Sequence, residues 1–263
     1  MKNILHAALF ELENMLAKKS TWLIAAAYTL FSLAICLSEQ LRQSWFSMTE
    51  SLPVTLYNFV LPYALVLILL SALSPTFAGD RERGIEQIPA ACLIGKKGRA
   101  RAKLIAAVLF AMIICTALVL STLIICSVSG LTNGGVLIKN IRSEAAEVRL
   151  KPVWSAFRHI GFSAVSLTVG SVFTGLLVLF ISAHAKSTIS AASISAVVVL
   201  FEFLINRFSF PTIMQEYNIW VFLKPYYLFG LETFNISPFV NLVILSLAFL
   251  PICVLEAWDI GRR

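Results

Sequence analysis

Long apolar stretches are the feature that most constrains how this chain folds. Six runs of the sequence are nearly free of charge, and each approaches the roughly 20 residues that a helix needs to cross a bilayer. Of the 263 residues, 59% are hydrophobic and only 13% are charged, whereas a soluble domain is usually about 25% charged. Such a chain cannot cover a surface that faces water. The sequence therefore predicts an all-α polytopic membrane protein that forms one domain over residues 1–263.

The six runs predict six transmembrane helices. They lie at about 21–37, 54–78, 104–128, 160–183, 188–205 and 237–257. Proline lies within the second and the sixth runs, at Pro75 and Pro251 among others, and would kink those helices. The fourth run carries Ser166, Gly170 and Thr174 at intervals of four. Small residues at this spacing let helix backbones approach closely, so we expect this helix to pack inside the bundle.

Charge predicts which ends of the spans face the cytoplasm. The net charge is +7, and seven Lys or Arg residues gather in the segment 79–103, between the second and third spans. Basic segments of this kind stay on the cytoplasmic side, against an anionic leaflet. Both termini are then cytoplasmic, and segments 130–157 and 206–235 are extracytoplasmic. Membrane topology thereby explains the excess of basic over acidic residues, and no nucleic-acid partner is expected.

The first 19 residues predict an amphipathic helix in the cytoplasmic interface. Leu5, Leu9, Leu12 and Leu16 recur at helical spacing. An ordinary solvated extension of the first span is the alternative. The stretch is too long and too mixed for the charged start of a signal peptide, and no small-residue cleavage site follows the first apolar run.

Segment 206–235 is rich in Phe, Tyr and Trp but too broken to span a membrane. Aromatic side chains favour the boundary between membrane and water. Two interpretations stay open. The segment forms re-entrant or interfacial short helices, broken near Lys224 and Pro225, or it forms a plain aromatic belt.

The residues typical of catalysis and metal binding are missing from the sequence. No GxxxxGK[ST] motif occurs, and the segment from Gly95 to Gly98 lacks its spacing. The three histidines, His6, His159 and His184, are far apart, and no pair of carboxylates lies within a span. The five cysteines show no CxxC spacing and are expected to pack as small apolar residues. The sequence predicts no catalytic residue, no metal and no cofactor in this chain.

Three residues are candidates for a substrate pathway. Glu202 is an acidic residue within the fifth predicted span, and an ionisable group in lipid is a functional-site hypothesis by default. Pairing with the nearby Arg207 is the structural alternative. Tyr57 and Asn58 lie toward the outer end of the second run and are candidates to face another subunit or a pathway.

The segment between the second and third spans carries a family resemblance. It runs Phe77-Ala78-Gly79-Asp80-Arg81-Glu82-Arg83-Gly84-Ile85, with Gly98-Arg99 and Ala102-Lys103 before the next span. This pattern resembles the cytoplasmic loop of ABC-2 type exporter permeases, which have the type V exporter fold. The resemblance covers essentially the whole chain. It implies an amphipathic N-terminal helix, six spans, cytoplasmic termini, a coupling helix and short re-entrant helices before the sixth span. Ile85 replaces the family's usual Thr, which leaves the start of the coupling helix less well defined.

The resemblance implies that this segment couples the chain to a separate ATPase. The acids and apolar residues exceed what a positive anchor needs, so coupling is favoured over that alternative. Apolar side chains would dock in a groove of the ATPase while charged ones fix the orientation. The predicted coupling residues are Asp80, Arg81, Glu82, Arg83, Gly84, Ile85, Glu86, Ile88 and Leu93.

By the same resemblance, the chain would be the permease subunit of an ATP-driven exporter in a plasma membrane, most simply a bacterial one. A second permease subunit, identical or different, would complete the pathway, and ATP and Mg²⁺ would be bound by the partner ATPase. The family's pathway is lined by the second and fifth spans, which points to Tyr57, Asn58 and Glu202. A hydrophobic or amphipathic substrate, such as a peptide, drug or lipid, is expected. A membrane-embedded enzyme and an ATP-independent transporter or channel are the alternatives.

Overall fold

The computed structural model describes residues 2–37, 56, 60–84, 95–128, 156–207, 220–223 and most of 242–255. These residues are helical almost throughout and include no strand, which confirms the all-α class. The helices are α1 (Lys2–Leu16), α2 (Lys19–Leu37), α5 (Leu61–Leu73), α6 (Pro75–Glu82), α7 (Gly95–Val128), α8 (Ala156–His184), α9 (Thr188–Arg207) and α11 (Trp220–Leu223).

Several of the described helices suit a membrane. Three are long and apolar enough to cross one, namely Leu61–Glu82, Lys97–Ile125 and Gly161–His184. Three shorter apolar helices are Lys19–Ile35, Thr188–Val199 and Leu242–Ile252. The long helices fall in the second, third and fourth predicted runs, and the short ones in the other three. The chain is thus consistent with a multi-pass membrane protein, and the number of six spans stays a prediction.

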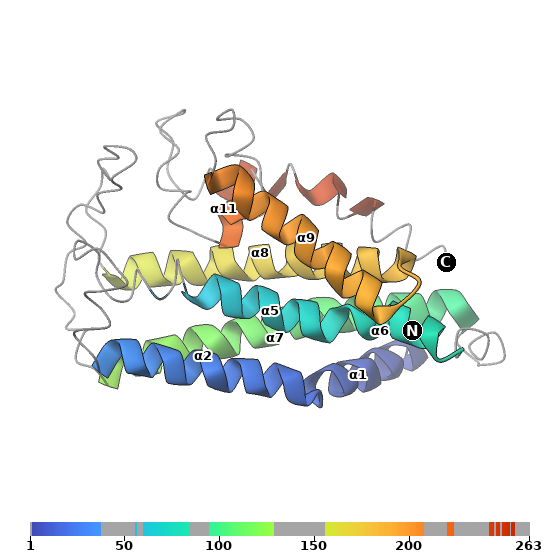
Figure 1. Ribbon diagram of the computed structural model, residues 1–263, viewed down its shortest axis with the longest axis horizontal. Helices are drawn as coiled ribbons and strands as arrows, with labels where there is room; N and C mark the ends of the chain where they lie inside the picture. Colours follow the sequence, from blue (N-terminus) through green and yellow to red (C-terminus); the bar gives the residue numbers. More distant parts are fainter. Residues whose placement is uncertain are drawn as a thin grey trace.

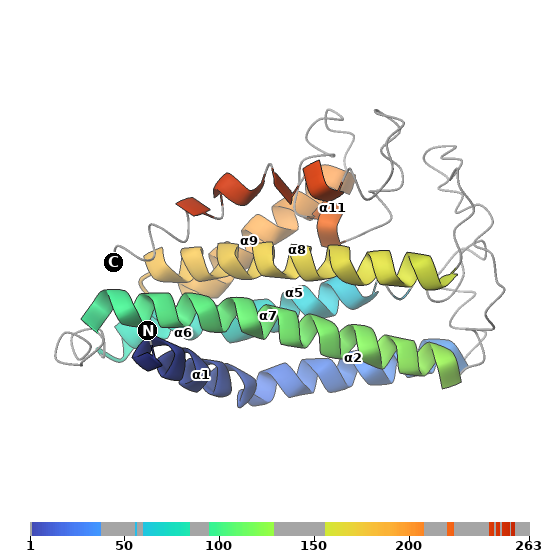
Figure 2. The same ribbon diagram turned by 180° about the vertical axis from the view of Figure 1, so that it is seen from behind.

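The helices lie side by side in an elongated bundle (Figures 1 and 2). Helix α7 packs on α8, and α5 packs on both α8 and α2. Helix α1 packs on α7 and turns away from the line of α2. The end of α6, the start of α7 and the turn between α8 and α9 gather at one end of the bundle, on the right in Figure 1.

The bundle core lies where α5, α7 and α8 meet. Leu65 and Leu69 of α5, Phe110 of α7 and Leu179 of α8 are completely buried there. Large apolar side chains are nevertheless exposed on the outer faces, for example Leu30 of α2. A helix that is apolar on every side is typical of a membrane span, because its outer face meets lipid instead of water.

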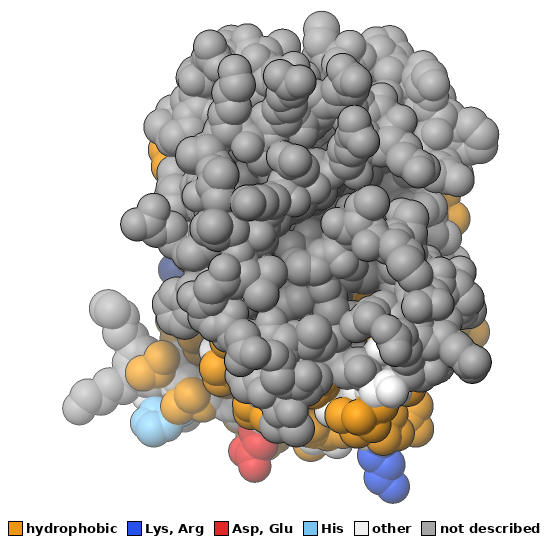
Figure 3. Space-filling model, turned by 90° about the vertical axis from the view of Figure 1, so that its left-hand side faces the viewer, with side chains coloured by type: hydrophobic (Ala, Val, Ile, Leu, Met, Phe, Trp, Pro, Cys, Tyr) orange, Lys and Arg blue, Asp and Glu red, His pale blue; other side chains and the backbone are white. Residues whose placement is uncertain are grey.

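Helix α1 divides its apolar residues between two environments. Leu12 and Met15 are buried in the core, where α1 meets α7. Leu5, Leu9 and Phe10 are at least half exposed. Figure 3 shows hydrophobic side chains along the lower edge of the molecule. The predicted leucine stripe is therefore split, with one part holding α1 to the bundle and the other left on its surface.

The small residues of α8 form a packing site for α11. Ser166 and Thr174 are fully buried, and the Ser166 hydroxyl donates a hydrogen bond of 2.8 Å to the Phe222 carbonyl. A Cβ atom at Gly170 would lie 2.9 Å from Cβ of Phe222 and 3.1 Å from the backbone nitrogen of Leu223. The prediction that this stripe packs inside the bundle is confirmed.

Gly170→Ala is expected to destabilise the protein by about 1–3 kcal/mol, because the added methyl group overpacks the contact with α11. Gly161→Ala is the matched control in the same helix, since nothing lies within 4 Å of a Cβ at that position. Alanine there should leave stability within about 1 kcal/mol or raise it slightly, because alanine favours helix more than glycine does. Thermal unfolding in detergent measures both, and equal midpoints for the two variants would contradict the close packing.

Candidate functional site

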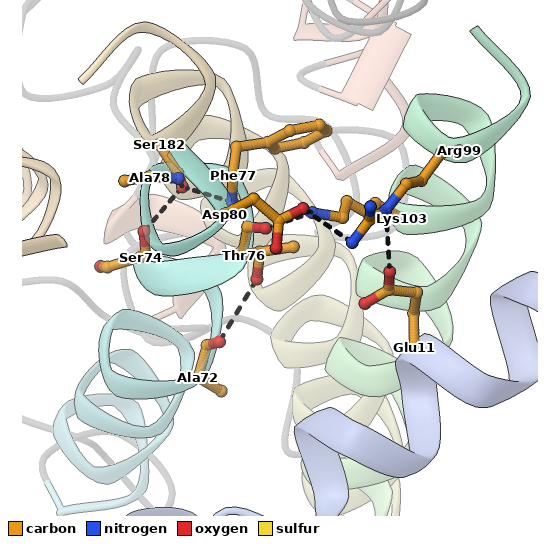
Figure 4. A network of polar contacts seen from close by, with 10 residues as sticks. All are labelled: Glu11, Ala72, Ser74, Thr76, Phe77, Ala78, Asp80, Arg99, Lys103 and Ser182. Carbon is orange, nitrogen blue, oxygen red and sulfur yellow. Dashed lines mark hydrogen bonds and ion pairs between the residues drawn. The ribbon is translucent and has the colours of Figure 1, made fainter. Parts of the chain in front are cut away.

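The break between α5 and α6 is closed by a serine from another helix. Pro75 has no N–H, so the backbone ladder is interrupted beside Ser74. The Ser182 hydroxyl of α8 donates a hydrogen bond of 2.6 Å to the Ser74 carbonyl. The same oxygen accepts hydrogen bonds from the amides of Phe77 and Ala78, at 3.1 and 3.2 Å. Figure 4 shows Ser182 between these groups. One buried hydroxyl therefore supplies partners to both sides of the break and attaches it to α8.

Two further side chains of α6 hold the turn between α8 and α9. The Arg81 guanidinium donates to the carbonyls of Ala183, at 3.0 Å, and Ala185. A cation is favourable there because the carbonyls at the end of α8 carry partial negative charge. The Thr188 hydroxyl, at the start of α9, donates to the Glu82 carboxylate at 2.6 Å. Two successive residues of α6 thus bind the end of α8 and the start of α9.

A buried ion pair joins α6 to α7. The Lys103 amine lies 2.5 Å from the Asp80 carboxylate, and only 1% of the Lys103 side chain is exposed. Arg99 of α7 lies 2.9 Å from the same carboxylate oxygen and 3.6 Å from Glu11 of α1. Lys103 also donates to the Thr76 carbonyl and lies 4.6 Å from the centre of the Phe77 ring. Asp80 of α6 therefore pairs with two cations of α7, and one of them, Arg99, also reaches Glu11 of α1 (Figure 4).

Through these contacts, α6 connects the helices at this end of the bundle. We call the set the α6 network, and it consists of Glu11, Asp80, Arg81, Glu82, Arg99, Lys103, Ser182 and Thr188. It fixes α6 directly to α7, α8 and α9, and through Arg99 to α1. Helix α6 ends at Glu82 with Arg83 as its C-cap. Gly84 follows with a φ of 66°, a left-handed conformation that favours glycine.

The structure describes five of the nine predicted coupling residues. Asp80, Arg81 and Glu82 have partners within the chain, whereas Arg83 and Gly84 are exposed. The other four, Ile85, Glu86, Ile88 and Leu93, lie outside the described residues.

The candidate pathway residues are not brought together by the described part of the chain. Tyr57 and Asn58 lie outside it. Glu202 lies in α9, and its side chain is outside the described residues. The described residues also contain no group of three or more His, Cys, Asp or Glu side chains that could hold a metal ion.

Sequence reasoning missed several members of the α6 network. Ser182 and Thr188 carry no local motif, and Glu11 was not singled out within the predicted amphipathic helix. Lys103 was noted as the residue that opens the third span, yet its partner was not. The signal that could have found it is position: a lysine at the edge of a long apolar helix needs an anion, and Asp80 is the first acid after the second predicted span.

Lys18, between α1 and α2, is a further cation near the α6 network. Its amine donates to the Ala72 carbonyl at the end of α5. Burial lowers the pKa of Lys18 from 10.5 to about 8, against the opposing effect of Glu11 and with added repulsion from Lys103 and Arg83. The protonated amine is thus held in a site that disfavours its charge.

No family model matches the chain, and no curated protein matches it.

Removing either member of the buried ion pair should destabilise the protein, by unequal amounts. Asp80→Asn leaves the Lys103 charge buried without an anion, and such a loss costs about 3–5 kcal/mol. Lys103→Met should cost less, because Asp80 keeps its contact with Arg99. The double variant should be more stable than the sum of the two losses predicts. Unfolding free energies in mixed micelles give this cycle, and additive losses would show that the two side chains do not interact.

Stability should rise between pH 8 and pH 10 through Lys18. The unfolded chain keeps this proton up to a pKa of 10.5, whereas the folded chain releases it near 8. The unfolded state therefore binds more protons in this window, and raising the pH favours the folded state. In neutral detergent, thermal midpoints should rise more with pH for the wild type than for Lys18→Met. Lys19→Met is the control at an exposed neighbour, and identical slopes for all three proteins would refute the prediction.

Proposed function

We propose that this chain is the membrane-spanning permease subunit of an ATP-driven exporter of the ABC-2 type. It works with a separate ATPase subunit that binds ATP and Mg²⁺, and a second permease subunit, identical or different, completes the pathway. The observation that carries the proposal is the α6 network. A segment that receives motion from outside the membrane must be attached firmly to the helices that it moves.

The contacts of α6 suit this transmission. Motion of the segment 85–94 enters α6 through Arg83 and Gly84. Asp80 passes it to α7 through Lys103, and Arg81 passes it to the end of α8. Glu82 passes it to the start of α9 through Thr188. One short helix thereby moves several membrane helices together, which a simple positive anchor would not require.

The predicted topology also gives the orientation of the bundle and the route of the cargo. Six spans with cytoplasmic termini place the α6 network at the cytoplasmic end of the bundle, in a bacterial plasma membrane. The contact of Phe222 with Gly170, near the middle of α8, favours a re-entrant segment over a plain aromatic belt. A hydrophobic or amphipathic cargo would pass along the second and fifth spans, near Tyr57, Asn58 and Glu202.

The chain purified from its native membranes should bring with it an ATPase. Mass spectrometry should identify a protein with the GxxxxGK[ST] motif, and the sample should hydrolyse MgATP in a vanadate-sensitive way. The double variant Arg83→Glu with Ile88→Asp should lose this partner. The first change reverses a charge of the coupling segment, and the second replaces one of its apolar side chains by a charged one. Lys19→Glu, the same charge change at another exposed site, should retain it.

A wild-type sample without such an ATPase would contradict the proposal. So would a double variant that folds, as judged by size-exclusion chromatography, and binds the ATPase as well as the wild type. Either result would direct attention to an ATP-independent transporter or channel, or to a membrane-embedded enzyme.

A further inference from the structure

A pocket of about 620 Å³ opens beside the α6 network, between α1 and α6. Its volume is in the range of small-molecule sites. Both apolar and charged side chains form its walls. The lining residues used in the argument are Phe10, Glu11, Lys18, Glu82, Arg83 and Arg99.

The acids of the pocket already have partners, but two of its cations have no anion. Glu11 pairs with Arg99, and Glu82 accepts from Thr188. Among the described residues, no carboxylate lies within ion-pair distance of Lys18 or Arg83. Lys18 and Arg83 both line the pocket, and Arg83 adds to the repulsion on the Lys18 charge, which Glu11 opposes. An anion placed between them would relieve that repulsion.

The pocket is continuous with the apolar surface of α1. Phe10 lines the pocket and is 63% exposed, and the exposed Leu9 is its neighbour in the chain. Figures 1 and 2 show α1 at the flank of the bundle rather than at its centre. An exposed apolar helix face beside a pair of cations is the arrangement that binds a molecule with an anionic head and hydrocarbon chains.

We propose that this pocket binds the phosphate of an anionic membrane lipid, held between Lys18 and Arg83, with the acyl chains along Phe10 and Leu9. The proposal does not depend on the ATPase partner, because all of these side chains belong to this chain. A partner protein could also use the two cations, but it would leave the exposed leucines and Phe10 of α1 without a role. A bilayer covers both features at once, and anionic lipids are abundant in the cytoplasmic leaflet.

The test uses the purified full chain without any ATPase. Delipidated protein is mixed with phosphatidylglycerol or phosphatidylcholine in neutral detergent, and bound lipid is counted by native mass spectrometry. The wild type should retain phosphatidylglycerol preferentially. Lys18→Gln and Arg83→Gln should each weaken that retention about fivefold, the loss expected for one cation near an anionic lipid. Lys18→Arg and Lys19→Gln should retain it, because the first keeps the charge and the second lies outside the pocket.

Further arms separate the sources of phosphate. Inorganic phosphate and glycerophosphoglycerol, the same head group without acyl chains, should fail to displace the lipid at equal concentration. Displacement by either would show a soluble-phosphate site and overturn the lipid assignment. Equal retention of the two lipids, or equal retention by all folded variants, would also overturn it. If the Gln variants keep the lipid in this test but lose the ATPase when they are purified from native membranes, the pocket serves the partner protein and the proposal is wrong.

Discussion

The packing at this end of the bundle depends on the buried amine of Lys103. A charge with 1% of its side chain exposed cannot remain there without a partner. Asp80 is that partner, so α6 must lie against α7 at one position along its length. Arg99 and Glu11 extend the pairing to α1, and Ser182 and Arg81 attach α6 to α8. Helix α6 consequently has one position from which all of these bonds can form.

The proline at the start of α6 explains why this arrangement needs side chains. Pro75 removes a backbone donor beside Ser74, and a helix broken in this way would be a weak connection. The Ser182 hydroxyl bonds both sides of the break. The second span therefore keeps its attachment across the interruption, and α6 is held by its neighbours. That is the physical basis of the transmission role proposed for it.

The sequence predicted the helical class and the small-residue packing well, because apolar length and residue size are local properties. Residues 104–128 were predicted as the third span, and α7 begins earlier, at Gly95, since basic residues can continue a helix beyond the membrane. The α6 network was harder to predict. Asp80, Arg81 and Glu82 were recognised as important, but their partners Lys103, Ala183 and Thr188 depend on which helices become neighbours. Hydroxyl and carbonyl partners of this kind leave no pattern in one sequence.

The most direct test of the central claim is to measure a distance between helices that α6 connects. Spin labels at Lys97 of α7 and Lys186 of the α8–α9 turn, both exposed, lie on elements that α6 connects. The native cysteines would first be replaced, and the protein reconstituted in lipid. Pulsed electron paramagnetic resonance should give one narrow distance distribution between the labels when α6 is unchanged, and a broad one after Asp80→Asn or Arg81→Gln. A broad wild-type distribution, or an unchanged narrow one in both variants, would contradict the claim that α6 holds these helices together.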